Sequence, residues 1–210
     1  MPGTTPPKTP LGEDKLTAVT GGVGDERISG TSANNLYETG YGNDTVLAWT
    51  GNDTVRAGAD NDHVSGQDGN DSIDGGDGTD IVLGGAGQDT VTGGAGSDMI
   101  VGGTGADLLN GDALLGVQGD DQFRWNPGDG NDTINGGGGT DLLIIEDTSI
   151  SLQALLNGLQ RDSGSAAPRM MNGYIDVTGF SGTLTINNET IRFSGLEKLL
   201  TGADMSFLGR

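Results

Sequence analysis

One phrase of nine residues, repeated in an unbroken frame, constrains this chain more than any other feature of its sequence. The phrase reads G-G-x-G-x-D-x-U-x, where U is apolar, and it is clearest between Gly84 and Leu109. Extending this frame in both directions without a gap gives ten copies, which begin at residues 21, 30, 39, 48, 57, 66, 75, 84, 93 and 102. A fixed period held over so many copies predicts an array of equivalent small structural units.

Positions 6 and 8 of the phrase carry its chemistry. Position 6 is Asp in the last eight of these copies: Asp44, Asp53, Asp62, Asp71, Asp80, Asp89, Asp98 and Asp107. Position 8 is apolar in all ten: Ile28, Tyr37, Val46, Val55, Val64, Ile73, Val82, Val91, Ile100 and Leu109. Side chains alternate between the two faces of a strand, so position 8 predicts one inward residue in each short strand.

The frame slips after Asn110 and then resumes. About five extra residues precede the next copy by the nine-residue count, and that copy ends with Asp121 and Phe123. Residues 127–135 and 136–144 restore the phrase, with Asp132 and Asp141 at position 6. The repeat region is therefore predicted to span residues 21–144.

This phrase resembles the nonapeptide repeat of the repeats-in-toxin (RTX) family. The resemblance implies an all-β, right-handed parallel β-roll with two nonapeptides per turn, in which the GGxGxD halves form loops and the xUx halves form strands. Position-6 residues eighteen apart would then stack in two columns. The first column is Asp44, Asp62, Asp80 and Asp98, the second is Asp53, Asp71, Asp89 and Asp107, and Asp121, Asp132 and Asp141 are expected to extend them.

The resemblance also implies that calcium lies between stacked loops. The position-6 carboxylates and carbonyl oxygens of the loop would hold it, and calcium favours such hard oxygen ligands. Glycine suits these loops because it permits positive φ and a close approach of the backbone to an ion. The glycines expected at the sites are Gly76, Gly78, Gly85, Gly87, Gly94, Gly96, Gly103 and Gly105. The columns predict about six to nine calcium ions.

Several copies depart from the phrase. Glu26 and Asn35 replace the position-6 Asp in the first turn, which is expected to be a degenerate end with weak or absent metal. Asp60 stands at a position-4 glycine, and Asp tolerates left-handed backbone geometry better than most residues. Trp49 and Gln67 stand at position 2, which makes the loops around the 44/62 and 53/71 pairs less regular than those from Gly75 onward.

The outward positions 7 and 9 differ between the two predicted sheets. One sheet carries ordinary polar residues, whereas the other carries Ile81, Leu83, Met99 and Val101, with Leu142 and Ile144 further along. An apolar stripe of this size is expected to be covered, either by the C-terminal segment or by a partner chain, which could be a second copy of this protein.

The amino-acid composition limits which kinds of partner the chain can bind. Asp and Glu number 30 against 10 Lys and Arg, so the net charge is −20. This charge repels a phosphate backbone and an anionic membrane, and it favours a cation. No apolar run is long enough to span a membrane. The sequence has no Cys, so disulfides and thiolate metal sites are excluded.

The flanking segments differ from the repeats. Residues 1–20 are rich in Pro and Thr and are expected to be a linker, which favours an upstream enzyme, toxin or adhesin domain. Residues 145–210 are expected to cap the roll, with a helix over 149–160, strands in 173–179, 182–188 and 189–195, and an Asn-rich turn between the last two. Residues 203–210 are loosely similar to the type I secretion signal of the family.

Catalytic constellations are not visible in the sequence. His63 is the only histidine and falls at outward position 7, where a surface residue is expected, so neither a zinc site nor a serine triad is predicted. Trp49 and Trp125 are interpreted as packing residues, with sugar stacking as the alternative. The resemblance to the RTX family implies a non-catalytic function: calcium-dependent folding, stabilisation and type I secretion of an extracellular bacterial protein. The alternative is an adhesive surface or biofilm module.

Overall fold

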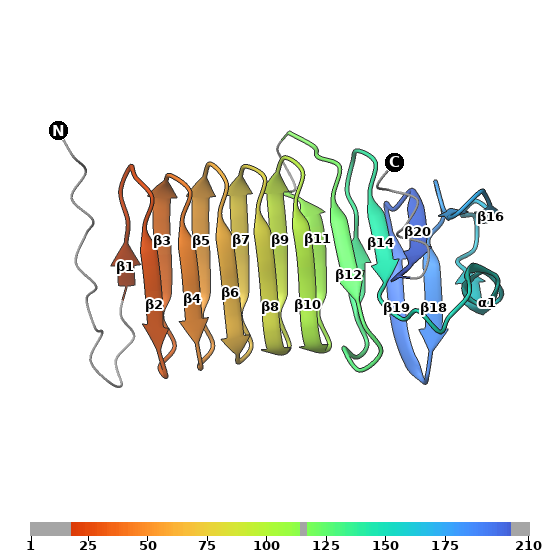
Figure 1. Cartoon of the computed structure of the whole chain (residues 1–210), viewed down its shortest axis with the longest axis horizontal. Helices are drawn as coiled ribbons and strands as arrows, with labels where there is room; N and C mark the ends of the chain where they lie inside the picture. Colours follow the sequence, from red (N-terminus) through yellow and green to blue (C-terminus); the bar gives the residue numbers. More distant parts are fainter. Residues whose placement is uncertain (1–17, 114–116, 203–210) are drawn as a thin grey trace.

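A computed structural model describes residues 18–113 and 117–202. The described chain is an elongated, flattened solenoid, in which successive strands lie alternately in two facing sheets (Figure 1). The predicted linker lies mostly outside the described residues, as does the secretion-signal candidate at 203–210. The expectation of a parallel β-roll followed by a mixed cap is confirmed.

Each sheet contains ten strands. In spatial order, the first sheet is β1 (Ala18–Thr20), β3 (Leu36–Tyr41), β5 (Thr54–Ala59), β7 (Ser72–Asp77), β9 (Thr90–Ala95), β11 (Leu108–Asp112), β13 (Thr133–Asn135), β19 (Glu189–Ser194), β18 (Gly182–Ile186) and β15 (Leu159–Arg161). The second sheet, in the same direction, is β2 (Arg27–Thr31), β4 (Thr45–Trp49), β6 (His63–Asp68), β8 (Ile81–Gly87), β10 (Met99–Gly105), β12 (Gln122–Trp125), β14 (Leu142–Ile145), β20 (Lys198–Thr201), β17 (Ile175–Asp176) and β16 (Arg169–Met170).

The register shows two nonapeptides per turn. Val55 pairs with Ile73, and Val64 pairs with Val82, each eighteen residues along the chain. Between β10 and β12 the offset grows, because Ile100 pairs with Phe123. The five extra residues predicted in this region are therefore accommodated in the loop between β11 and β12, and the ladder continues without a break.

The core of the roll is a thin layer of side chains between the two sheets. The position-8 residues from Tyr37 to Leu143 are at most 2% exposed, as the alternation predicted. Each short strand contributes one such side chain, so the cross-section is thin and each turn packs mainly on its two neighbours. Ile28, in the first turn, is only partly buried.

The C-terminal segment adds both parallel and antiparallel strands. β19 pairs with β13 and β20 pairs with β14, both in parallel, so the roll's ladder continues beyond residue 144. The remaining strands of the segment pair antiparallel and end both sheets. The division of the chain at residue 144 stays a prediction, although the parallel pairing crosses it.

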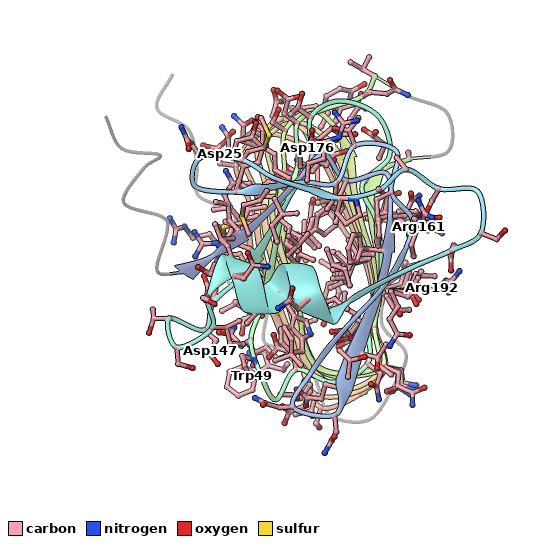
Figure 2. The ribbon with its side chains drawn as sticks, turned by 90° about the vertical axis from the view of Figure 1, so that its right-hand side faces the viewer. Asp25, Trp49, Asp147, Arg161, Asp176 and Arg192 are labelled. Carbon is pink, nitrogen blue, oxygen red and sulfur yellow. The ribbon has the colours of Figure 1, made fainter. Side chains whose placement is uncertain are left out.

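The predicted helix and hairpin of the cap are confirmed. Helix α1 (Leu152–Gly158) begins after Ser151, whose side chain accepts a hydrogen bond from the Ala154 N–H at 3.2 Å. It is shorter than predicted because Leu159 already has an extended backbone and begins β15. Seen along the roll, α1 lies across the end of the space between the sheets (Figure 2), and Leu155 joins the core there.

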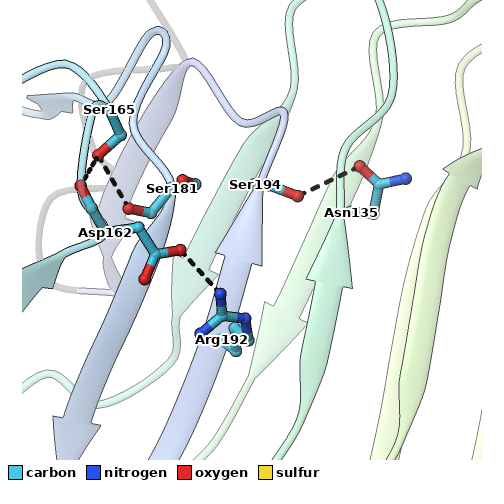
Figure 3. Close-up of polar contacts among 6 residues, drawn as sticks. All are labelled: Asn135, Asp162, Ser165, Ser181, Arg192 and Ser194. Atoms are coloured by element: carbon cyan, nitrogen blue, oxygen red, sulfur yellow. Dashed lines mark hydrogen bonds and ion pairs between the residues drawn. The ribbon is translucent and has the colours of Figure 1, made fainter.

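Polar contacts fasten the cap to itself and to the roll. Arg192 of β19 forms an ion pair with Asp162 at 2.8 Å, and Ser165 donates hydrogen bonds to the carbonyls of Asp162 and Ser181 (Figure 3). Ser194 contacts Asn135 of β13 across the junction between cap and roll. These contacts are largely exposed, so the buried apolar residues of the cap supply most of its stability.

The apolar stripe is only partly covered. Leu142 and Ile144 are buried against Leu200, and Tyr174 packs on the same cluster, so the cap covers this end as expected. The four residues on β8 and β10 lie outside that contact, because β12 with its polar outward residues stands between them and β14. Ile81 is 37% exposed, while Leu83, Met99 and Val101 are half-buried.

Truncation of a position-8 side chain should destabilise the roll. Leu143 is fully buried, and the substitution Leu143→Ala is expected to cost about 2–5 kcal/mol of unfolding free energy, measured by urea denaturation in excess calcium. The matched control is Leu108→Ala, at an outward position that is 42% exposed, where a change within about 0.5 kcal/mol is expected. Equal losses of unfolding free energy in the two variants would contradict the placement of position 8 in the core.

Candidate metal centre

The position-6 acids lie in the loops along the two edges of the roll. The first column follows the loops that lead from the first sheet to the second, at the upper edge of Figure 1, and the second column follows the opposite edge. Asp121 and Asp141 extend the first column and Asp132 extends the second, as expected. All eleven side chains are buried, with at most 3% of their surface exposed.

Each column is joined by a chain of hydrogen bonds. The backbone N–H of one position-6 Asp donates to Oδ1 of the Asp one turn further on, at 2.7–2.9 Å. One carboxylate oxygen of each acid therefore orders the neighbouring loop, which fixes the orientation of the other oxygen.

The second carboxylate oxygen has no donor in ten of the eleven acids. These buried, unpartnered Oδ2 atoms belong to Asp44, Asp53, Asp62, Asp71, Asp80, Asp89, Asp98, Asp107, Asp121 and Asp141. A buried acceptor without a partner costs about 1–3 kcal/mol, and a charged one costs more. A repeated cost of this kind indicates that a cation belongs to the folded state.

Backbone oxygens converge on the same places. A Cβ built on Gly75 would lie 2.5 Å from the carbonyl oxygen of Gly93, one turn on, and 2.7 Å from Oδ2 of Asp80. The position-1 glycine thus leaves open a space that two acceptors share and no donor enters. An equivalent pair, one carboxylate Oδ2 and one carbonyl oxygen from the next turn, lies beside each of six glycines: Gly66, Gly75, Gly84, Gly93, Gly111 and Gly136.

Burial raises the pKa values of the column acids. Desolvation is the largest cause for Asp98, whose pKa rises to about 8, and the nearby Asp80 and Asp121 raise it further. The same cause raises the pKa values of Asp62 and Asp89 to about 7. These acids are therefore poorly accommodated as bare anions, and a cation between the turns would favour their ionised form.

The glycines expected in the loops lie at or directly after the C-terminal ends of strands β7 to β10, along the two edges of the roll. Seven of them have positive φ: Gly76, Gly85, Gly87, Gly94, Gly96, Gly103 and Gly105. Each would bring a Cβ into the carbonyl at the same loop position one turn back, as would Gly78. Glycine at these positions therefore favours close stacking of adjacent turns. Coordination of an ion by their carbonyl oxygens stays a prediction.

The irregular copies keep the loop geometry. Trp49, Asp60 and Gln67 adopt the left-handed conformation that glycine has elsewhere, with φ values of 79°, 79° and 73°. The difference in this half of the roll lies at position 1, where Thr39, Ala48 and Ala57 each carry a Cβ. The Thr39 hydroxyl also donates to the Ala57 carbonyl at 2.5 Å, so that oxygen is already engaged.

Asp132 differs from the other column acids. Its Oδ2 accepts a hydrogen bond from Nε1 of Trp125 at 2.8 Å, and Trp125, the last residue of β12, is 1% exposed. The interpretation of Trp125 as a packing residue agrees with this burial. Oδ2 of Asp132 therefore has a hydrogen-bond donor, unlike the other column acids, and the expected role of Asp132 as a metal ligand stays a prediction.

Two further acids meet the first column without belonging to the phrase. Oε2 of Glu197, in the cap, accepts the Asp141 N–H at 2.7 Å. Asp112 accepts N–H groups from Gly119 and Gly138, at 3.0 and 2.7 Å, and so fastens the inserted loop. The nine-residue count missed Glu197 because its loop is shorter, although its spacing before the apolar pair Leu199 and Leu200 is a usable signal.

The donor set fits calcium. Among the described residues, no group of three or more His, Cys, Asp or Glu side chains gathers at one point. An ion here would therefore be held by one or two carboxylates together with backbone carbonyl oxygens, and calcium accepts six to eight oxygens of both kinds. His63 is exposed on β6, and no helix in the described part of the chain is long and apolar enough to cross a membrane.

The fold and these loops define a calcium-binding β-roll. A sequence model of the RTX calcium-binding nonapeptide repeat (4 copies) matches overlapping segments between residues 20 and 123, and also residues 128–144. These segments cover more than half of the chain, which therefore belongs to the RTX calcium-binding repeat family. Comparison with curated proteins gave no match.

The calcium-free chain should respond to acid in the opposite way to most proteins. Acids whose pKa is raised on folding bind protons more tightly in the folded state, so acidification stabilises that state. The effect begins as pH falls through about 8, the pKa of Asp98, and is complete below the usual value of 3.8. Far-UV circular dichroism of calcium-depleted protein should show more β-structure at pH 5 than at pH 8.5.

Calcium should reverse this trend, because protons and calcium compete for the same carboxylates. The control is the same pH series in excess calcium, where the β-signal should weaken on acidification. A calcium-free signal that falls with pH would contradict the burial of uncompensated acids in the columns.

Proposed function

We propose that this chain is a calcium-operated folding module that stabilises a secreted bacterial protein and assists its export. Repeats of this family bind calcium and are typical of secreted bacterial proteins. The observation that carries the proposal is the set of buried, unpartnered carboxylate oxygens along both edges of the roll. Without calcium, repulsion between the column acids would oppose folding of the roll. With calcium bound, the same acids would hold neighbouring turns together.

The proposed ligands are the column acids with unpartnered Oδ2 atoms and the carbonyl oxygens at position 1 of the following turn. The six positions where both oxygens converge are the strongest candidates, which agrees with the lower end of the expected range of ions. Calcium would supply positive charge between two layers of acceptors. The protein's own part is to order each carboxylate through Oδ1 and to keep a glycine beside Oδ2.

Calcium dependence also suggests how export would be controlled. Extracellular modules bind calcium with a Kd of roughly 10⁻⁴ to 10⁻³ M, far above the cytosolic concentration. The chain would therefore stay unfolded inside the cell, pass through a type I exporter, and fold outside. An upstream enzyme, toxin or adhesin domain would be the cargo. A roll of this kind is structural, so no catalytic role is proposed for it.

The adhesive alternative has less support. It needs an accessible apolar surface, and the stripe on β8 and β10 offers Ile81 as its only side chain more than one-third exposed. Extended apolar patches of a few hundred Å² are the usual mark of an association surface. Self-association through Ile81, Leu83, Met99 and Val101 stays a prediction of the sequence.

A calcium titration tests the proposed function. Far-UV circular dichroism of chelator-treated protein should change cooperatively from coil to β-structure on addition of calcium, and magnesium at the same concentration should not replace it. The variant Asp80→Asn removes one ligand charge and keeps the side-chain shape. At a calcium concentration roughly 100 times Kd, loss of its site should cost about 2.7 kcal/mol of stability.

The matched control is Asp68→Asn, at the exposed C-terminal end of β6 in the neighbouring copy. It should leave both the midpoint and the stability close to those of the parent chain. A chain that is fully folded in chelator and indifferent to calcium would refute the proposal. Equal effects of the two substitutions would show that general charge, rather than the column, controls folding.

A further inference from the structure

Glu197 stands where a column acid would stand in one more turn of the roll. β14 and β20 pair in parallel, with Leu143 opposite Leu199. The Lys198 N–H donates to the Asp141 carbonyl at 3.0 Å, as the Met99 N–H donates to the Asp80 carbonyl at 2.8 Å. This register places Lys198 at position 7, Leu199 at position 8 and Glu197 at position 6.

The carboxylate of Glu197 makes the bond that defines the column. Its Oε2 accepts the Asp141 N–H at 2.7 Å, and Oδ1 of Asp141 in turn accepts the Asp121 N–H at 2.9 Å. Glutamate is one methylene longer than aspartate. That extra length lets the shortened loop of the cap reach the same N–H that an Asp reaches from a loop of normal length.

The other members of the repeating oxygen set are also present at this junction. Asp141 is fully buried, and its Oδ2 has no hydrogen-bond partner. A Cβ built on Gly136 would lie 2.7 Å from that Oδ2 and would also meet the carbonyl oxygen of Gly195. Gly195, in the cap, therefore takes the role that Gly93 takes for Asp80 inside the roll.

The second column ends differently, which provides an internal contrast. The Arg192 N–H donates to the Asp132 carbonyl at 2.8 Å, so Arg192 is at position 7 and Ile191 is at position 6. The cap therefore offers no carboxylate to this column, and Oδ2 of Asp132 is already bonded to Trp125. At the junction with the cap, the second column therefore ends on Ile191, whereas the first column ends on the carboxylate of Glu197.

Resting on the calcium binding proposed above, we infer that the cap completes a last calcium site of its own with the roll. Its ligands are the Asp141 carboxylate from the roll, and the Gly195 carbonyl oxygen and Glu197 carboxylate from the cap. This site lies outside the nonapeptide repeats on its cap side, and Glu197 is 56 residues from Asp141 along the chain. The ion would join the cap to the first column, so cap docking and calcium binding would be one event.

Calorimetric counting of calcium on the full chain tests this site. The variant Glu197→Gln keeps an oxygen that can accept the Asp141 N–H but removes the charge. We expect one site to weaken by roughly tenfold or more, so that the number of tightly bound ions falls by one. Gly136→Ala should remove the same ion from the roll side, because its Cβ would enter the space between the two oxygens.

The matched control is Glu189→Gln. Glu189 also lies in the cap and accepts a loop N–H, that of Gly128 at 2.8 Å, but it faces none of the unpartnered column oxygens. Its substitution should leave the calcium count unchanged. An unchanged count in both Glu197→Gln and Gly136→Ala would overturn the shared site, even if the cap were destabilised. Absence of calcium binding by the parent chain would instead refute the proposed function.

Discussion

Buried carboxylate oxygens that lack a hydrogen-bond donor set the conditions under which this roll can fold. Each strand of the roll contributes one position-8 side chain to the interior, and only a few strands add a second apolar side chain, so the hydrophobic core is thin. The acids at both edges are buried, and their Oδ1 atoms accept hydrogen bonds from backbone N–H groups of the adjacent loops. At six positions the remaining oxygen lies close to a backbone carbonyl oxygen. Without a cation these contacts are repulsive, and in the proposed function calcium between the oxygens would link the turns.

Position 1 of the repeat separates the roll into two parts. From Gly66 onward, glycine at this position lets a carboxylate and a carbonyl meet in six loops. In the three copies before it, Thr39, Ala48 and Ala57 fill part of that space with a side chain, and the buried alanines and threonine add to the core instead. With calcium bound as proposed, the N-terminal turns would depend more on packing and the later turns more on the ion.

The sequence could predict whatever the period determines. The strands, the inward residues and the continuation of the columns through Asp121, Asp132 and Asp141 all follow from a nine-residue frame. The period could not predict that Trp125 would bond to Asp132, because Trp125 and Asn126 fall between two copies and outside the nine-residue frame. It could not identify Glu197, whose place depends on pairing between β14 and β20 far apart in the chain. The period also could not predict how much of the apolar stripe the cap covers, because that depends on where the cap strands lie.

Long-wavelength X-ray diffraction from crystals of the full chain grown in calcium would test the central claim most directly, since calcium's anomalous signal locates each ion. The account predicts peaks beside Oδ2 of Asp71, Asp80, Asp89, Asp98, Asp121 and Asp141, and none beside Asp132, where the indole donates. Peaks confined to exposed acids, with Oδ2 atoms along the columns still without a partner, would contradict it.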